Sequence, residues 1–176
     1  GGFGVLIAGA VENQGVIICP MGTIALAGGN HVRLDISGNK LISIAIDEET
    51  ANEVYDYDGN KITDQIKNTG SLTADGGTII LRAEALPGIF EKAINMSGYI
   101  KADRVENKDG VVKLISSGSI EISGEISATK IEIGREATPP ASVNMPDNAK
   151  LIGEESVKVA ADKVTVNTAS PIVVID

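Results

Sequence analysis

The acidic segment 56–60 (DYDGN) contains the side chains best suited to hold a metal ion. Ca²⁺ requires several hard oxygen ligands on a flexible loop, and the sequence places more carboxylates nearby at Asp47, Glu48, Glu49 and Asp64. Gly59 comes too early for the EF-hand pattern, and the sequence lacks the glycine-rich nonapeptide calcium repeat. A solvated acidic loop is therefore the expected structure, with calcium binding as the less favoured alternative.

The same segment is the most plausible contact surface for a partner molecule. Binding residues are concentrated on loops that a rigid scaffold positions. The predicted binding surface consists of Tyr55, Asp56, Tyr57 and Asp58.

Two single residues could do chemistry but lack the partners that it needs. His31 is the only histidine, and no serine or cysteine arrangement near it favours a catalytic base, so an exposed turn residue is expected. Cys19 is the only cysteine, which excludes an intrachain disulfide. It precedes Pro20 in an apolar segment and is expected to be buried as a small hydrophobic residue rather than to bind metal. The sequence therefore predicts no catalytic residue and no metal ligand.

A pair of carboxylates keeps an enzymatic interpretation open. Asp75 and Asp103 occupy equivalent positions of the internal repeat described below, and a polysaccharide-cleaving enzyme needs carboxylates that converge in a groove. Aromatic platforms for sugars are nearly absent, because the chain has 3 Tyr, 2 Phe and no Trp. We expect no enzyme, and a convex position of the two aspartates would exclude this alternative.

Composition limits the other function classes. The chain of 176 residues has 24 acidic and 15 basic residues, a formal net charge of −9, which disfavours nucleic acid and anionic membranes as partners. No run of eighteen apolar residues is present, so no membrane-spanning helix is expected. The sequence does not start with a charged segment followed by an apolar stretch, so no signal peptide is expected. We expect a processed or excised piece of a longer protein. With 43% hydrophobic residues and few rings, the core must be aliphatic.

The elements that position these residues follow from an internal repeat. The pattern Asn-x-Gly at 13–15 and Gly-Thr-Ile-x-Leu at 22–26 recurs 55 residues later, at 68–70 and 77–81. A looser third copy covers 97–102 and 110–114, with five additional residues between its halves. Apolar residues alternate with polar ones along the chain, which indicates short strands with one buried face.

Three short strands in each repeat of about twenty residues are typical of an all-β solenoid, and we expect a parallel β-helix of roughly seven coils. Hairpins could use the same short turns, so the spacing alone leaves the topology open. Equivalent residues then stack on one another, and an amide ladder is expected from Asn13, Asn68 and Asn107. Glycines are expected to supply positive φ at the corners. These glycines are Gly15, Gly70, Gly98, Gly118 and Gly124.

Three excursions interrupt this single segment of residues 1–176. Residues 47–66 form an acidic loop, and residues 137–148 form a proline-rich loop. Residues 84–96 are predicted to form a short amphipathic helix. Its apolar face consists of Leu86, Ile89, Phe90, Ala93 and Ile94.

The order of several blocks resembles filamentous haemagglutinin-like exoproteins, in their secretion-domain region and the β-helix coils that follow it. The resemblance covers roughly residues 5–133, and each block alone is a weak signal. The blocks are 11–17 (VENQGVI), 22–29 (GTIALAGG), 32–38 (VRLDISG), 41–47 (LISIAID), 68–79 (NTGSLTADGGTI), 98–102 (GYIKA) and 122–128 (ISGEISA).

The resemblance implies a right-handed parallel β-helix that is secreted by the two-partner route through an outer-membrane transporter. It also implies a location on the bacterial outer surface or in the medium. The expected function is that of a rod in adhesion, aggregation or presentation of binding loops, with a cell-surface receptor or glycan as partner. The alternatives are the passive shaft of a contact-dependent toxin and the polysaccharide-cleaving β-helix enzyme.

Overall fold

The computed structural model of the chain describes residues 1–36, 42–167 and 172–175, and these residues form strands and turns without a helix. None of the described elements is therefore an apolar helix that could cross a membrane. The strands are β1 (Phe3–Ala8), β2 (Val11–Asn13), β3 (Val16–Ile18), β4 (Thr23–Gly28), β5 (His31–Ile36), β6 (Ile42–Glu48), β7 (Asp64–Asn68), β8 (Ser71–Thr73), β9 (Thr78–Ala83), β10 (Lys92–Met96), β11 (Tyr99–Ala102), β12 (Val111–Ser116), β13 (Ser119–Ile122), β14 (Glu125–Ile133), β15 (Ser142–Met145), β16 (Lys150–Val159), β17 (Val164–Val166) and β18 (Ile172–Val174).

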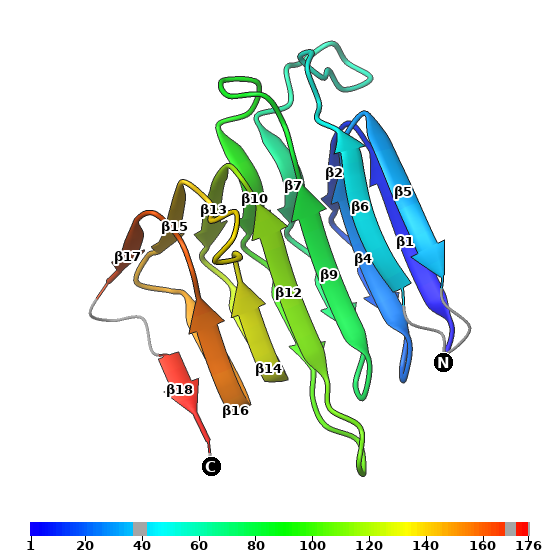
Figure 1. Ribbon diagram of the computed structural model, residues 1–176, viewed down its shortest axis with the longest axis vertical. Coiled ribbons are helices and arrows are strands. Elements are labelled where there is room, and N and C mark those ends of the chain that lie inside the picture. Colours follow the sequence, from blue (N-terminus) through cyan, green and yellow to red (C-terminus); the bar gives the residue numbers. More distant parts are fainter. Residues whose placement is uncertain (37–41, 168–171, 176) are drawn as a thin grey trace.

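All strands except β5 and β6 wind into a parallel β-helix with three faces (Figure 1). Face A contains β1, β4, β9, β12 and the second halves of β14 and β16. Face B is the six-stranded sheet β2-β7-β10-β13-β15-β17. Face C contains β3, β8, β11, the first halves of β14 and β16, and β18. The chain visits A, B and C in turn and completes six turns, so the predicted parallel β-helix is confirmed.

The stacking register is the one that the sequence repeat predicts. Residues 55 positions apart stack directly, as Val11 on Ile66 and Ile17 on Leu72. In the next turn Tyr99 stacks on Ser71 and Val111 on Thr78. The five residues added in the third copy are absorbed by the turn 103–110, which lies between β11 and β12.

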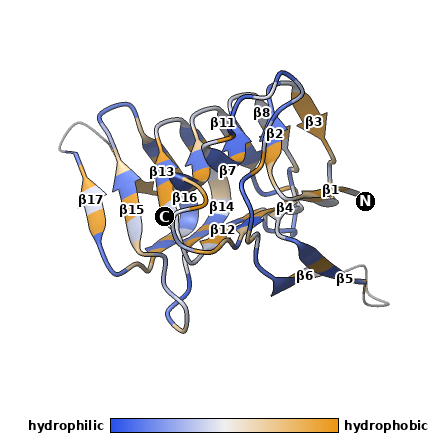
Figure 2. Cartoon of the chain, turned by 90° about the horizontal axis from the view of Figure 1, so that it is seen from above, coloured by the Kyte–Doolittle hydropathy of each residue, from blue (hydrophilic) through white to orange (hydrophobic). Residues whose placement is uncertain are grey.

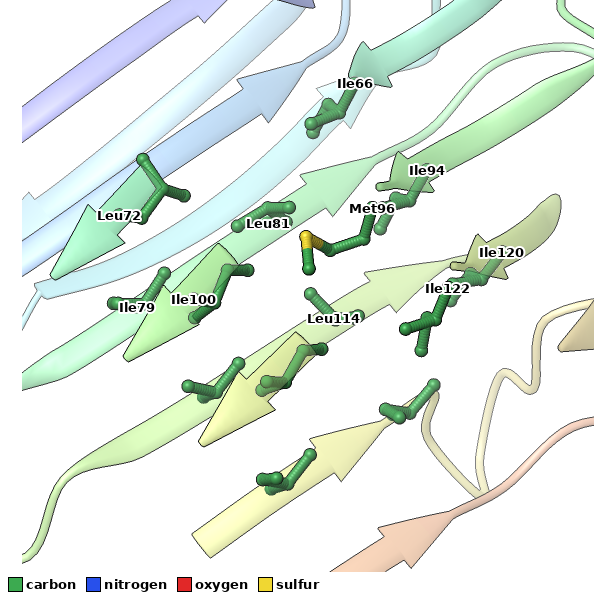
Figure 3. Packing of buried hydrophobic residues seen from close by; sticks show 14 of the residues in the cluster. Ile66, Leu72, Ile79, Leu81, Ile94, Met96, Ile100, Leu114, Ile120 and Ile122 are labelled. Carbon is green, nitrogen blue, oxygen red and sulfur yellow. The ribbon is translucent and has the colours of Figure 1, made fainter. Parts of the chain in front are cut away.

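The interior is filled by ladders of aliphatic side chains, which Figure 3 shows for the central turns. One ladder on face A runs through Leu26, Leu81 and Leu114, all fully buried. Burial of each such side chain contributes about 1.5–3 kcal/mol. Face B supplies Ile66, Ile94 and Ile120 in the same way, and the core is aliphatic as predicted.

A short polar ladder is built into this core. Asn13 Nδ2 donates to Asn68 Oδ1 at 2.7 Å, and both side chains are buried. The next position of the ladder is Met96, whose Sδ lies 3.4 Å from Asn68 Nδ2. The prediction of Asn107 as the third member is wrong, because Asn107 belongs to the turn 103–110 and not to a stacked strand.

We expect Asn68→Ala to lower the free energy of unfolding by about 1 kcal/mol, because it removes the acceptor of a buried amide donor. The cost stays modest since Asn13 Nδ2 also contacts Gly15 O at 3.3 Å. Urea unfolding measures this loss of stability. The matched control is Asn144→Ala, at a partly exposed position of β15 on face B. Equal midpoints for the two variants would contradict the ladder.

The antiparallel pair β5–β6 corrects the prediction that residues 32–46 belong to coils. These strands form a separate two-stranded hairpin on the outer surface of face A (Figure 2). Ile44 packs there against Ala25, Ala27 and Ile80. Small outward side chains on β4 give the hairpin room to approach. The β5–β6 hairpin contains residues that the alternating pattern assigns to coils, and this is why six turns form rather than seven.

The helix predicted over 84–96 is also wrong. Residues 84–91 form a turn in which Gly88 has φ of +85°, and β10 follows at Lys92–Met96. Pro87-Gly88 stops a helix, and the apparent helical spacing joins side chains of the turn with buried side chains of the strand.

The other two predicted excursions have different limits in the structure. The proline-rich loop 137–148 contains β15, which stacks between β13 and β17. The acidic excursion 47–66 begins inside β6 and ends inside β7. Both proposed loops therefore lose residues to the strands beside them.

The corner glycines do not have the positive φ predicted for them. Left-handed glycines among the described residues are Gly59, Gly76, Gly88 and Gly134. At the corner between faces B and C, glycine is needed because the backbones of neighbouring turns approach closely. A Cβ on Gly70 would lie 2.1 Å from Gly15 O, and one on Gly98 would lie 2.2 Å from Gly70 O.

Candidate functional site

The long excursions gather on one edge of the β-helix, where the chain passes from face A to face B. Corners 9–10 and 117–118 of this edge are two residues long, whereas residues 29–63, 84–91 and 134–141 are long connections. We call the segments 49–63, 84–91 and 134–141 the loop edge. In Figure 1 the first two segments project together beyond the upper ends of the strands. By contrast, the first four corners between faces B and C are two residues long.

A buried glutamine fastens the loop edge to the scaffold. Gln65 is fully buried, and its Nε2 lies 2.9 Å from Glu84 O, 3.0 Å from Thr50 Oγ1 and 3.3 Å from Gly9 O. The backbone of Thr50 also donates to Glu84 O at 3.0 Å, and Leu86 N donates back to Thr50 O at 3.0 Å. Segments 49–63 and 84–91 are therefore joined at their bases.

Beyond this base, residues 53–62 fold into a small hairpin. Tyr55 and Lys61 form an antiparallel bridge, and Ile62 N donates to Val54 O at 2.8 Å. Lys61 Nζ lies 2.6 Å from Glu53 Oε1, and this hydrogen bond lowers the pKa of Glu53. The Tyr55 hydroxyl donates to Glu53 Oε2 at 2.5 Å, which raises the pKa of Tyr55. The loop thus has a defined structure of its own.

The four residues of the predicted binding surface lie at the tip of this hairpin, with different surroundings. Asp56 Oδ1 accepts hydrogen bonds from the backbone N of Asp58 at 2.9 Å and of Asn60 at 2.8 Å. Its carboxylate therefore stabilises the turn. Tyr57 is fully exposed at 103% and Tyr55 is exposed at 55%. These two rings are the surfaces that a partner could contact.

The calcium alternative finds no support in the geometry. Over residues 1–36, 42–167 and 172–175, no three His, Cys, Asp or Glu side chains are grouped so that they could hold a metal ion. Asp56 instead holds its own loop through Asn60, whose Nδ2 donates to Oδ2 at 3.0 Å.

The Asp56 turn predicts a pH dependence. The side-chain amide of Asn60, followed by its backbone N–H, holds the pKa of Asp56 below its ordinary value of 3.8. A lowered folded-state pKa means that the turn is fully stabilised above the ordinary value and is lost as the pH falls through the lowered one. NMR titration of the Asp58 and Asn60 amides is expected to show a midpoint below 3.8. A midpoint at or above that value would contradict these hydrogen bonds.

Two pockets open on the loop edge where a short corner lies beside a long one. A pocket of about 230 Å³ lies between corner 9–10 and the hairpin of residues 53–62. The charged residues of its lining are Glu12, Asp56, Asp64, Lys61 and Lys67. Lys67 Nζ is 3.1 Å from Glu12 Oε1, so part of this charge is already neutralised. A second pocket of about 250 Å³ lies between the turn 84–91 and corner 117–118.

The aspartates that kept the enzyme alternative open do come together, as the repeat predicts. Lys101 Nζ lies 3.0 Å from Asp75 Oδ2 and 3.4 Å from Asp103 Oδ2. Hydrogen bonding to Asp75 raises the pKa of Lys101. Asp103 N also donates to Asp75 Oδ1 at 3.0 Å. The two carboxylates thus share an ammonium group in contacts between successive turns.

The remaining reactive residues lie apart from the loop edge pockets. His31 Nδ1 lies 3.6 Å from Asp47 Oδ2, and the imidazole is exposed on the β5–β6 hairpin. Cys19 is a partly buried thiol that packs against the main core. Sequence reasoning identified the hairpin tip but missed the turn 84–91 as part of the same edge.

The chain is similar to a distant relative among known proteins. The chain is 26% identical over 125 residues to the heme/hemopexin-binding protein of Haemophilus influenzae, a match that covers 70% of this chain and 12% of that protein. No family model and no solved structure matches the chain. The relative's name describes a binding protein, and the chain spans about an eighth of the relative's length.

Proposed function

We propose that this chain is a segment of a large secreted bacterial surface exoprotein, exported by the two-partner route through an outer-membrane transporter. It acts as a rigid rod that presents the loop edge to a partner on another cell or on a host. The resemblance of its ordered blocks, the parallel β-helix and the similarity to a binding protein support this proposal. The attachment of loop 49–63 through buried Gln65, with Tyr57 fully exposed at its tip, is the observation that carries it.

The relative's name suggests haem and hemopexin as ligands. A haem iron needs an axial His, Met, Cys or Tyr beside an apolar cavity. His31 is exposed and pairs with Asp47, and the Tyr55 hydroxyl is bound to Glu53. Neither His31 nor Tyr55 fits haem as an axial ligand, so a protein partner such as hemopexin agrees better with the loop edge.

A loop replacement tests the proposal. Residues 51–62 are exchanged for a Gly-Ser linker that keeps Thr50 and Thr63, and the matched control exchanges the turn 105–108 on another corner. Binding of the segment to target cells is expected to fall at least tenfold for the first variant and to stay unchanged for the control, because loops on a rigid scaffold carry binding.

The two alternatives predict other results. A passive shaft would bind cells in no form of the protein. A polysaccharide-cleaving enzyme would release reducing ends from a polysaccharide panel, and Asp75→Asn would abolish that release. Either outcome would overturn the proposed binding function.

A further inference from the structure

The second pocket of the loop edge is apolar and is not part of the predicted Tyr55–Asp58 surface. The turn 84–91 forms one wall, and the short corner at Gly118 forms the floor. The residues that matter below are Leu86, Phe90, Ala93, Gly118 and Ala141. Leu86 is exposed at 46%, so an apolar side chain stands open to solvent at the pocket's rim.

The pocket is a fixed feature of the fold. Gly118 has no side chain to occupy the floor of the pocket. A Cβ at this position would lie 2.9 Å from the Cβ of Ala93, so glycine keeps the floor open. Ser119 Oγ donates to Glu91 O at 2.9 Å, and Ala141 N donates to Ser117 O at 3.1 Å. These bonds join corner 117–118 and the first residue of β13 to both long segments that flank them, so the pocket is preformed.

The loop edge on which the pocket opens is acidic. The loop edge carries seven acidic residues and two basic ones, Lys61 and Arg135, within a chain of net charge −9. Lys61 is already paired with Glu53. Glu84 and Glu91 stand at the two ends of the turn that forms the pocket wall. An apolar pocket on an acidic edge is complementary to an apolar side chain flanked by cationic residues.

We propose that this pocket is the anchor site for a large aliphatic or aromatic side chain within a basic polypeptide segment of the partner. The proposal deepens the proposed function, since it names the chemical class of the partner at the loop edge. The pocket volume of about 250 Å³ suits one large side chain. Anchors of this kind, desolvated in a central pocket and surrounded by polar contacts, dominate the affinity of protein interfaces.

An NMR titration of the intact segment with three capped pentapeptides tests the chemistry. The sequences are Lys-Arg-Leu-Arg-Lys, Lys-Arg-Ala-Arg-Lys and Glu-Asp-Leu-Asp-Glu. The first is expected to shift the Phe90 ring and the Gly118 and Ser119 amides, and to bind about tenfold more tightly than either of the others. Equal shifts from the acidic peptide, or shifts confined to residues 53–62, would overturn the proposal.

Matched substitutions separate the pocket from the rest of the edge. Ala141→Leu fills the pocket from its exposed rim, whereas Ala137→Leu makes the same change elsewhere in segment 134–141. Ala141→Leu is expected to weaken binding of the basic leucine peptide about tenfold, and Ala137→Leu to leave it unchanged. Leu86→Ser, which removes one apolar wall in an exposed turn, provides an independent second test with the same expected loss.

Cell binding distinguishes failure of this inference from failure of the proposed function. If the 51–62 replacement abolishes cell binding but Ala141→Leu and Leu86→Ser do not, the proposed function stands and the anchor pocket is wrong. If neither pocket variant weakens binding of the basic leucine peptide, the anchor pocket is wrong, whatever the result of the cell-binding assay. Loss of cell binding in both the loop and the pocket variants supports the two proposals together.

Discussion

Replacing Gly98 by Ala is expected to lower the free energy of unfolding by about 3 kcal/mol, the upper end of the usual cost of overpacking. The new Cβ would lie 2.2 Å from Gly70 O, and this contact involves backbone that a side-chain rotation cannot relieve. Gly124 stands in the same relation to Gly98 O, at 2.0 Å, so a shift of one corner would disturb the next. The strain is therefore passed along the stack instead of being relaxed locally.

Urea unfolding followed by circular dichroism measures this loss. Gly4→Ala is the matched control, because no atom of the described residues lies within 4 Å of a Cβ at Gly4 and its φ is not in the left-handed region. Its free energy of unfolding is expected to stay within about 0.5 kcal/mol of the parent. Similar stabilities for the two alanine variants would show that the corner is not closely packed.

The second large effect is expected for Gln65→Leu, with a loss of about 2 kcal/mol. The substitution removes the donor that Glu84 O, Thr50 Oγ1 and Gly9 O share, in a site without access to water. A buried group that loses its partner costs about 1–3 kcal/mol. The total stays low because Gln65 Oε1 has no hydrogen-bond partner within the described part of the chain and because Thr50 N still donates to Glu84 O.

Hydrogen exchange gives this prediction its local signature. The Thr50 and Leu86 amides, which join segments 49–63 and 84–91, are expected to lose protection, whereas amides of the central β12 keep theirs. Gln14→Leu, at an exposed glutamine whose Nε2 donates to Glu12 Oε1 at 3.0 Å, is the control and should leave protection unchanged. Unaltered protection at Thr50 in the Gln65 variant would refute the proposed fastening of the loop edge.

The stacking register could be predicted because the fold repeats its environments. A residue in a parallel coil has its equivalent above and below it, so the offset of 55 between Asn13 and Asn68 became a direct contact. The aliphatic core followed in the same way from alternation. In a repeating coil, the offset between two equivalent positions in the sequence therefore predicts which residues contact each other.

The wrong predictions, coil strands at 32–46 and a helix over 84–96, concern segments whose local sequence pattern does not determine which surface they pack against. Val32 and Ile44 alternate with polar residues as coil strands do, but their apolar sides pack on the outside of face A, where Ala25 and Ala27 leave room. Periodicity identifies a buried face without telling which surface covers it. Around Phe90, the apolar spacing matched a helix by coincidence, and the Pro87-Gly88 pair was the signal that a turn interrupts it.

The candidate site was foreseen only in part for a similar reason. The composition of 55–58 indicated an exposed loop with two tyrosines, and the structure places both rings in solvent. The apolar pocket depends on the short corner at Gly118 lying beside the long turn 84–91, although the two are distant in sequence. Such a juxtaposition requires the coil register, and the apolar spacing of residues 84–96 predicts a helix where the turn lies.

The segment between β4 and β7 has a consequence for how the chain reaches its native state. Elsewhere each new turn can add to a finished neighbour after closing a short loop, so assembly can proceed stepwise like a growing crystal layer. At residues 29–63 the chain must close a much longer loop, and the β5–β6 hairpin must dock on face A, before β7 can pair with β2. Turns beyond β7 are therefore expected to nucleate first, and the amino-terminal turn to join them late, at a rate set by this single closure.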